Sequence, residues 1–448
     1  MKKNTFTRVC LTVCIGCFGF QSNILLAKEN QKNISDYSIP SELSPVWKWK
    51  NGYTAEETMY YRRAYNGEAL TESGDVGVYA TRNLGEVIPT ALVHRDGPVV
   101  MLEKAPIPEI ANVTATTDLG TMTLRQMMDD PRSRFKAIAV VHKGKLVFEE
   151  YIGLRPWDNH IWASAAKSLN GILINQLEEE GRINLSAPVS TYLPELKGTA
   201  WAKVAVADVL HQHSGLDIRE GSLGEPGHPT TLFYKTFAGG DDLPKDASFM
   251  TSVKMAGKLR EPKQLFEYAS INTFVLGMIL EKITGKPFHD LVTERIWSKA
   301  GMEGDALLGL SPSGEPSAFG MFSSRLRDMA RYGMLYTPSW SVVAKERVVS
   351  ETYLPKVYAA SIPEIFPGNN LGDRMIKGFG NIEMGASYQW DAVFSDGDIY
   401  KSGRTGQCLY ISPETDTVVV WFSSTYQSTL WVHAYAREIV KKIFRKNE

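Results

Sequence analysis

Ser164 and Lys167 are the residues whose types and spacing most directly suggest chemistry. They stand three positions apart at the start of an apolar stretch, and residues at i and i+3 lie on one face of a helix. The Ser164 hydroxyl and the Lys167 amine would then come within hydrogen-bond reach. A serine becomes a nucleophile when a neighbour takes its proton, and an amine does this when burial or nearby cations lower its pKa. The pair therefore predicts attack on a carbonyl carbon, with Lys167 as the base.

A helix after this pair is indicated by the helical spacing of four apolar residues, Leu169, Ile172, Leu173 and Leu177. Gly181 is a natural end for that helix. Ser164 would lie at the helix N-terminus, where free backbone N–H groups and the helix dipole favour a developing oxyanion. The alternative is that Ser164 only caps the helix and Lys167 is a solvated surface residue. A Ser-x-x-Lys motif without other supporting motifs leaves that alternative open.

Two further clusters of residues favour the catalytic interpretation of Ser164 and Lys167 over the helix-cap interpretation. Residues 266–272 read FEYASIN and precede a helical pattern, and residues 403–407 read GRTGQ and precede a strand-like run. A Ser-x-x-Lys, a Tyr-x-Ser-x-Asn and a cation-Thr-Gly triplet at a strand edge, in this order, resemble the serine β-lactamase and penicillin-binding protein superfamily. The pattern is most similar to its class C-related branch. Within that branch, residues 213–215 (HSG), 327–333 (RDMARYG) and 406–407 (GQ) are most similar to esterases and 6-aminohexanoate-dimer hydrolases.

The resemblance, which covers about residue 135 to the C-terminus, implies a role for each matched residue. Ser164 would form an acyl-enzyme with an ester or amide, and Lys167 would accept its proton. Tyr268 would relay a proton to the leaving group and later help to activate water, with the division of labour between Lys167 and Tyr268 left open. The backbone N–H groups of Ser164 and Gln407 would form the oxyanion hole.

The remaining matched residues would support the site. Ser270 and Asn272 would order it through hydrogen bonds. Arg404, followed by Thr405 and Gly406, would hold positive charge near the base or meet a substrate carboxylate. Arg404 stands where penicillin-recognising relatives have lysine or histidine, and Ser270 stands where they have asparagine. Both departures weaken the case for β-lactam turnover and leave the Ser, Lys and Tyr chemistry untouched.

The leading hypothesis is an exported serine hydrolase for small esters or amides, or for a peptide. A related alternative is a β-lactamase or D-alanyl peptidase, and an alternative of another class is a non-catalytic module that binds such a ligand. Asp217, after the Ser-Gly turn, could orient a substrate amine, although a loop acid is more often solvated. His211 and His213 have no third ligand at metal-site spacing, so neither a metal nor another cofactor is expected.

The elements that position these residues indicate an α+β fold, with an antiparallel sheet flanked by helices as in β-lactamases and transpeptidases. Residues 135–141 and 145–151 form a predicted hairpin, and residues 399–401, 408–412 and 417–423 are predicted strands. Strands at both ends of the core sequence suggest one sheet completed by both, with an all-helical lobe of about residues 201–340 inserted between them. An amphipathic helix from about 430 to 445 closes the chain.

Residues 28–130 are expected to form an N-terminal extension packing on the core domain of residues 131–448. Residues 91–94 and 98–102 are predicted strands about the turn at residues 95–97. Thr123 and Gln126 form a predicted capping box at the start of a short helix.

Residues 1–27 begin with basic residues and continue with a short apolar run, as in a secretory signal peptide. We therefore expect export, to the periplasm or beyond the cell, and Cys17 is a weak candidate for lipidation. Loss of residues 1–27 would remove three basic residues and no acid, leaving 46 basic and 50 acidic side chains. That balance argues against a nucleic-acid partner. No later apolar stretch is long enough to span a membrane, and the oligomeric state is left open.

Overall fold

The computed structural model of the chain describes residues 39–239, 243, 247–428 and 431–445. All of these belong to one compact unit. The predicted signal peptide, with Cys17, lies outside the described residues.

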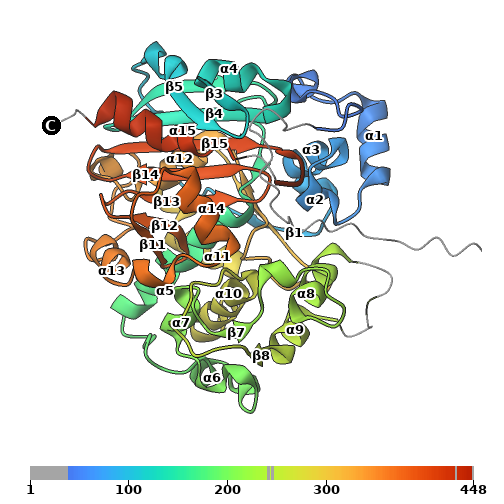
Figure 1. Ribbon diagram of the computed structural model, residues 1–448, viewed down its shortest axis with the longest axis vertical. Helices are drawn as coiled ribbons and strands as arrows, with labels where there is room; N and C mark the ends of the chain where they lie inside the picture. The colour runs from blue at the N-terminus through green and yellow to red at the C-terminus, as the bar shows by residue number, and fades with distance from the viewer. Residues whose placement is uncertain (1–38, 240–242, 244–246, 429–430, 446–448) are drawn as a thin grey trace, which may run out of the picture. The chain divides into compact units, whose positions relative to one another are not determined.

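A seven-stranded antiparallel sheet forms the centre of this unit (Figure 1). Its spatial order is β11, β12, β13, β14, β15, β4, β5. The strands are β4 (Phe135–His142), β5 (Lys145–Tyr151), β11 (Met384–Ser387), β12 (Trp390–Phe394), β13 (Ile399–Gly403), β14 (Gln407–Ser412) and β15 (Thr417–Ser423). β15 pairs with β4, so the two ends of the core sequence do complete one sheet, and the predicted fold class is confirmed.

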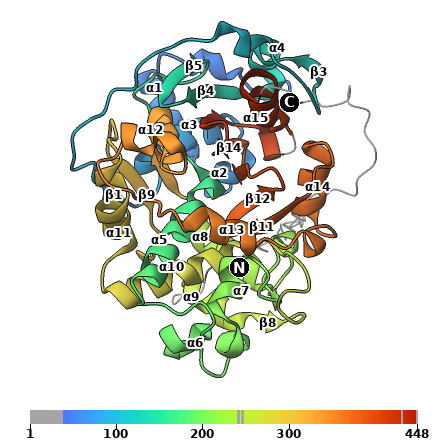
Figure 2. The ribbon, with the colours of Figure 1, turned by 90° about the vertical axis from the view of Figure 1, so that its left-hand side faces the viewer.

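Helices cover both faces of the sheet because alternate residues of each strand point to opposite faces. Along β4, Ala137 and Ala139 belong to one apolar cluster, whereas Ile138 and Val140 belong to another. The first cluster packs on α5 (Lys167–Glu179) and α12 (Leu326–Met334), and the second on α4 (Leu124–Asp129) and α15 (Ala434–Ile439). Figure 2 shows α12 and α15 on opposite sides of the strands.

The inserted lobe is mainly helical and gathers below the sheet in Figure 1. It contains α6 (Val189–Tyr192), α7 (Val206–Leu210), α8 (Pro229–Ala238), α9 (Phe249–Met255), α10 (Ser270–Thr284) and α11 (Phe288–Arg295), together with the short strands β7 (Leu216–Asp217) and β8 (Gly257–Lys258).

The prediction of an all-helical lobe as far as residue 340 was too broad. β9 (Ala306–Gly309) and β10 (Phe322–Ser324) lie within that range and form a second sheet with β1 (Thr90–Val93) and β6 (His160–Ile161). The four residues of β9, three of them hydrophobic, are too few for hydrophobic periodicity to separate strand from helix.

The N-terminal residues are tied to the core by β1 and by a buried lysine. β1 pairs with β9, so the predicted hairpin about residues 95–97 does not form. The helices are α1 (Ala55–Ala64), α2 (Ala69–Glu72) and α3 (Asp75–Arg82). Lys136 of β4 is fully buried and donates to the carbonyl of Val78 (3.2 Å) and the hydroxyl of Thr81 (3.0 Å), both on α3. The predicted capping box of Thr123 and Gln126 is present at the start of α4.

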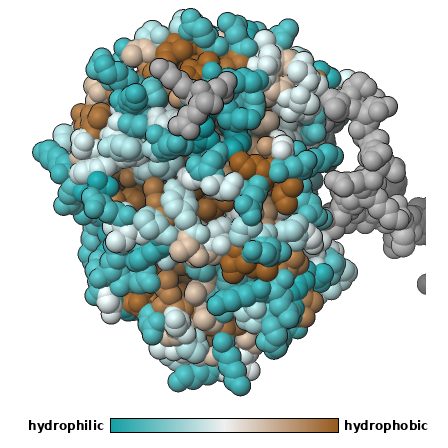
Figure 3. All heavy atoms as spheres, turned by 60° about the vertical axis from the view of Figure 1, so that its left-hand side comes forward, coloured by the Kyte–Doolittle hydropathy of each residue, from teal (hydrophilic) through white to brown (hydrophobic). Residues whose placement is uncertain are grey.

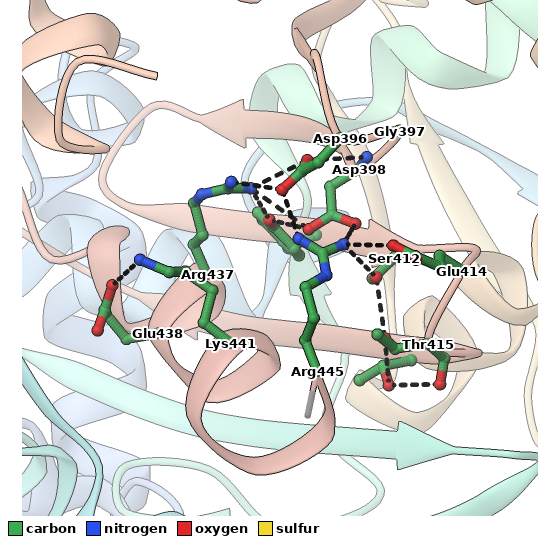
Figure 4. A network of polar contacts seen from close by, with 12 residues as sticks. Asp396, Gly397, Asp398, Ser412, Glu414, Thr415, Arg437, Glu438, Lys441 and Arg445 are labelled. Carbon is green, nitrogen blue, oxygen red and sulfur yellow. Dashed lines mark hydrogen bonds and ion pairs between the residues drawn. The ribbon is translucent and has the colours of Figure 1, made fainter. Parts of the chain in front are cut away.

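A polar network fixes the C-terminal helix to the turn between β12 and β13 (Figure 4). Arg437 of α15 donates to Asp396 (2.5 Å) and to Asp398 (3.4 Å), and Arg445 donates to Asp398 (2.8 Å). The Asp398 side chain is fully buried, so these charge-assisted hydrogen bonds satisfy a carboxylate that burial would otherwise penalise. The helix begins at Ala434, later than the sequence predicted, and ends in a π-turn at Val440–Phe444.

Within the described ranges, no helix is both long and apolar enough to cross a membrane. On the face drawn in Figure 3, apolar side chains gather in separate patches between hydrophilic ones.

Candidate active site

Ser164 follows a strained turn at the end of β6. Ala163 has φ +45°, in the left-handed region that residues with a Cβ rarely adopt. The turn is held because the N–H of Trp162 donates to the Phe322 carbonyl (2.7 Å) and its indole donates to Ser324 (2.9 Å). Ser164 lies in the 3-10 turn Ala163–Ala166, and the α-helix predicted to begin near it begins at Lys167.

The Ser164 hydroxyl oxygen lies 3.0 Å from the Lys167 Nζ atom. Ser164 is partly exposed, whereas Lys167 is fully buried. Nζ also lies 2.5 Å from the Phe319 carbonyl oxygen and 3.1 Å from the Ser270 hydroxyl. The structure therefore brings together the two residues that the sequence singled out, with Ser164 partly exposed to solvent and the Lys167 amine buried behind it.

Burial lowers the pKa of Lys167 from its ordinary value of 10.5 to about 7, and the positive charge of Lys401 adds to this effect. Glu220 and Asp391 act in the opposite direction. A neutral amine has two N–H groups and one lone pair. The Phe319 carbonyl can only accept, and Ser270 can accept the second N–H. The lone pair is then available for the Ser164 proton, so Lys167 is equipped to act as a base near neutral pH.

Tyr268, in the loop before α10, lies between two lysines. The Nζ atoms of Lys167 and Lys401 lie 5.0 Å and 4.8 Å from the centre of its ring. Its hydroxyl is buried and faces the Ser164 hydroxyl. Burial, followed by the charges of Asp391 and Glu220, raises the pKa of Tyr268 well above 10, although the facing Ser164 hydroxyl opposes the shift. Tyr268 is therefore a neutral phenol that can donate a proton.

Ser270 and Asn272 support the site from α10. Ser270 lies 3.1 Å from the Lys167 amine and 3.0 Å from the hydroxyl of Tyr234. Asn272 donates to the side-chain oxygen of Gln212 (2.8 Å), which also accepts the Ala269 N–H (3.1 Å). Asn272 thus fixes the loop that carries Tyr268, without touching the reacting atoms itself.

The cation beside Lys167 is Lys401 and not Arg404, which corrects one of the two roles predicted for Arg404; the other role, binding a substrate carboxylate, stays a prediction. The Lys401 amine is buried on β13 and pairs with the buried carboxylate of Asp391. That carboxylate also accepts from the N–H (2.9 Å) and the hydroxyl (2.6 Å) of Ser402. The sequence contains two cation-hydroxyl-glycine triplets in tandem, at 401–403 and 404–406, and only burial identifies the first as the one that faces Tyr268.

The residues predicted from the second triplet form the turn between β13 and β14. Arg404 is exposed and donates to the Thr71 carbonyl (3.0 Å). Thr405 is buried with φ +65°, and Gly406 donates its N–H to the Gly403 carbonyl (3.0 Å). Gln407 lies opposite Gly403, and its side chain donates to the hydroxyl of Thr405 (2.8 Å). The side chains of Thr405 and Gln407 therefore stabilise the turn.

Asp217 was predicted to orient a substrate amine, but it is paired within the lobe. It accepts hydrogen bonds from Arg219 (2.8 Å) and from His228 (3.2 Å). Burial alone would raise the pKa of Asp217, and these two partners outweigh it and lower the pKa.

Glu220, three residues later, is the acid that reaches the site, and it was not predicted from the sequence. It accepts the Ser270 N–H (2.7 Å), and its charge raises the pKa of Lys167 and of Lys401. Nothing in the residue pattern separates it from the other acids of this loop. Among the described residues, no three His, Cys, Asp or Glu side chains are placed to hold a metal ion.

Comparison with known proteins gives a consistent result. Residues 122–439 match a family model described as Beta-lactamase. The chain is 30% identical over 385 residues to the 6-aminohexanoate-dimer hydrolase of Paenarthrobacter ureafaciens, with 83% of this chain and 92% of that protein covered. It is 27% identical over 163 residues to the teichoic acid D-alanine hydrolase of Staphylococcus aureus, which covers 34% of this chain and 36% of that protein.

Two solved structures show the same fold. A Bacillus anthracis protein assigned as a 6-aminohexanoate-dimer hydrolase superimposes with a TM-score of 0.67 at 23% identity, covering 82% of this chain and 92% of that one. EstCE1, a hydrolase with promiscuous acyltransferase activity, superimposes with a TM-score of 0.56 at 16% identity, covering 71% and 96%.

Proposed function

The chain belongs to the β-lactamase family of serine hydrolases, which act on amide or ester bonds, and on this basis we propose that it cleaves a small ester or amide through an acyl-enzyme on Ser164. The observation that carries this proposal is the 3.0 Å contact between the Ser164 hydroxyl and a buried Lys167 whose pKa is about 7. A buried amine that titrates near neutral pH is the group that this nucleophile needs.

The first step is attack of the Ser164 oxygen on the substrate carbonyl carbon, as the Ser164 proton moves to Lys167. The oxyanion would be stabilised by the backbone N–H groups of Ser164 and Arg404. The sequence predicted Gln407 as the second donor, and we propose Arg404 in its place. The support comes from Gly403, because a Cβ on Gly403 would lie 2.3 Å from the Trp162 carbonyl oxygen. The end of β13 therefore lies against the segment that carries Ser164, and Arg404 supplies the next N–H. One such donor contributes about 3 kcal/mol to the transition state.

Collapse of the tetrahedral intermediate breaks the bond to the leaving group, which must take up a proton if it is an amine. Tyr268 is protonated at every working pH and lies beside Ser164, so it is the proposed donor. Its proton is restored from the Lys167 ammonium formed in the first step, which leaves the Lys167 amine neutral again. Water then attacks the acyl carbon, its proton passes to the neutral Lys167 amine with the assistance of Tyr268, and the ammonium protonates the Ser164 oxygen as the acyl bond breaks.

Tyr268→Phe should separate substrates by their leaving group. We expect kcat/KM for an amide to fall by about 10² to 10³, because an amine cannot leave without a proton. Hydrolysis of p-nitrophenyl acetate should fall by less than about tenfold, because p-nitrophenolate leaves unprotonated. Steady-state kinetics on the amide and the ester with the same acyl group would test this. An equal loss on both would assign Tyr268 another role.

The leading substrate class is a small amide or ester, because the relative that matches most of the chain is a hydrolase of 6-aminohexanoate dimers, which are small amides by name. Lys401 favours a second candidate, a β-lactamase or D-alanyl peptidase. Lys401 is a lysine of the kind that penicillin-recognising relatives have at this place, where the sequence had suggested Arg404. It therefore removes one of the two departures that weakened the case for β-lactam turnover. Turnover of a chromogenic cephalosporin, measured beside a short-chain ester, would decide between them.

Labelling with a fluorophosphonate tests the proposed function against the non-catalytic alternative. The folded wild-type chain should react stoichiometrically, peptide mapping should place the phosphonate on Ser164, and ester hydrolysis should stop in proportion to labelling. A correctly folded chain that remains unlabelled and hydrolyses no ester would be a binding module. Label on another residue would move the site.

We propose that the chain acts outside the cytoplasm, because residues 1–27 have the pattern of a signal peptide. The oligomeric state does not enter the proposed chemistry.

A further inference from the structure

Residues 66–72, here called the strap, contact two elements that also border the Ser164 site. One is α8, on the helical lobe, and the other is the turn between β13 and β14, on the sheet. The strap comes from the N-terminal part of the chain, to which the family resemblance assigned no function.

The contact with α8 is made by Gly67. A Cβ on Gly67 would lie 2.3 Å from the Cβ and 2.4 Å from the Cα of Ala238, so the strap backbone rests directly on the end of α8. Tyr234 precedes Ala238 by four residues, on the same helix face. Its hydroxyl lies 3.0 Å from Ser270, which in turn contacts the Lys167 amine. The strap therefore meets the lobe one helical turn from the catalytic hydrogen bonds.

The contact with the sheet is made by Thr71. Its carbonyl accepts the Nε–H of Arg404 (3.0 Å), and Arg404 directly follows Gly403, whose backbone lies against Trp162. Burial raises the pKa of the next strap residue, Glu72, and the charge of Arg404 opposes that shift. The strap therefore meets the sheet next to the proposed oxyanion hole.

Between these contacts the strap is held in shape. The Asn66 side chain accepts the Ala69 N–H (3.1 Å), and Leu70 is 1% exposed within the larger apolar cluster. Gly77 of α3 lies against the Ala69 carbonyl, where a Cβ would come within 2.3 Å. A segment buried on one side and anchored at both ends is a fixed part of the site's border.

We infer that the strap sets an upper limit on the acyl chain of the substrate by bridging the lobe and the sheet beside Ser164. This inference rests on the proposed function. A short acyl group reaches Ser164 beneath the strap, whereas a long chain has to pass under a segment that cannot move without losing the Gly67 and Thr71 contacts. The N-terminal residues would then determine specificity rather than serve only as packing.

A series of p-nitrophenyl esters tests the inference, because the leaving group stays constant while the acyl chain lengthens. Wild type should hydrolyse the acetate and butyrate well and the octanoate at least about tenfold more slowly in kcat/KM. Gly67→Ala forces the strap away from the α8 backbone and should raise the octanoate-to-acetate ratio by on the order of tenfold. Gly257→Ala is the matched control, since that glycine has open space around it in the lobe, and its ratio should equal that of wild type.

Ala238→Leu repeats the test from the other side of the contact, because a larger side chain on α8 pushes on the same point of the strap. If Gly67→Ala fails to fold, as judged by thermal unfolding, Ala238→Leu and the wild-type series still decide. A wild-type octanoate rate equal to the acetate rate, or an unchanged ratio in a folded strap variant, overturns the inference and leaves the acyl-enzyme proposal intact. A wild-type chain that hydrolyses neither an ester nor an amide and takes no fluorophosphonate on Ser164 overturns both.

Discussion

Lys167→Arg is expected to lower kcat/KM for a short-chain ester by a factor on the order of 10⁴, even though it preserves the positive charge. The guanidinium of arginine does not lose its proton in proteins, so it cannot accept the proton of Ser164. Lys167→Met should lose about as much activity. An equal loss in Lys167→Arg, which keeps the positive charge, and in Lys167→Met, which loses it, would show that Lys167 acts as a base and does not merely supply charge. Initial rates between pH 6 and pH 10, with circular dichroism of each variant, would measure the effect.

Lys356→Arg is the matched control for this substitution. Lys356 contacts Glu178 and Asn175 at the far end of α5 and has no contact with the site. Its arginine variant should retain wild-type kinetics. If Lys167→Arg kept activity within about tenfold of wild type at pH 8, the proton would have to go elsewhere, and Tyr268 would become the candidate base despite its raised pKa.

Local patterns in the sequence were enough to find the Ser164–Lys167 pair and the fold class. Ser164 and Lys167 could be paired because i and i+3 spacing is a local property, and the structure preserves it through a 3-10 turn as well as it would through an α-helix. Five of the seven strands of the central sheet could be placed because they are alternating or buried apolar runs, whereas β11 and β12 were not predicted. The termini of such runs are less certain, and the α-helix after Ser164 begins three residues later than expected.

The charged residues of the site could not be ranked from sequence, because their roles depend on burial. Arg404 and Lys401 each begin a cation-hydroxyl-glycine triplet, and the difference between them is that Lys401 is 0% exposed and pairs with Asp391. Asp217 and Glu220 share one loop, and only the folded chain turns Glu220 toward Ser270. The pairing of β1 with β9, some 200 residues away, is equally invisible to local patterns.

Lys401→Met is expected to move the acid limb of the pH profile upward by at least about one unit. Lys167 must be neutral to act, so kcat/KM should rise as the pH passes its pKa of about 7 and then stay high, because the pKa of Tyr268 lies well above 10. The charge of Lys401 lowers the pKa of Lys167, and the charge of Asp391 raises it. Lys401→Met removes the charge that lowers the pKa of Lys167 and keeps the Asp391 charge that raises it. The pKa of Lys167 therefore rises, and more of the amine is protonated at pH 7. The rate at pH 7 should fall about tenfold or more, while the rate near pH 9 falls less.

Two further variants make the cause of this shift specific. Lys401→Met also leaves the Asp391 carboxylate buried without its partner, which costs about 3 to 5 kcal/mol of stability, and Lys401→Met/Asp391→Asn should recover part of that loss. Because the double variant removes both opposing charges, its acid limb should lie between those of wild type and Lys401→Met. Arg404→Gln tests the assignment first made from the sequence and should leave the midpoint of the limb in place. The opposite result would be a midpoint that shifts in Arg404→Gln and does not shift in Lys401→Met. It would mean that Arg404, and not Lys401, lies beside Lys167, and that the edge of β13 is oriented differently.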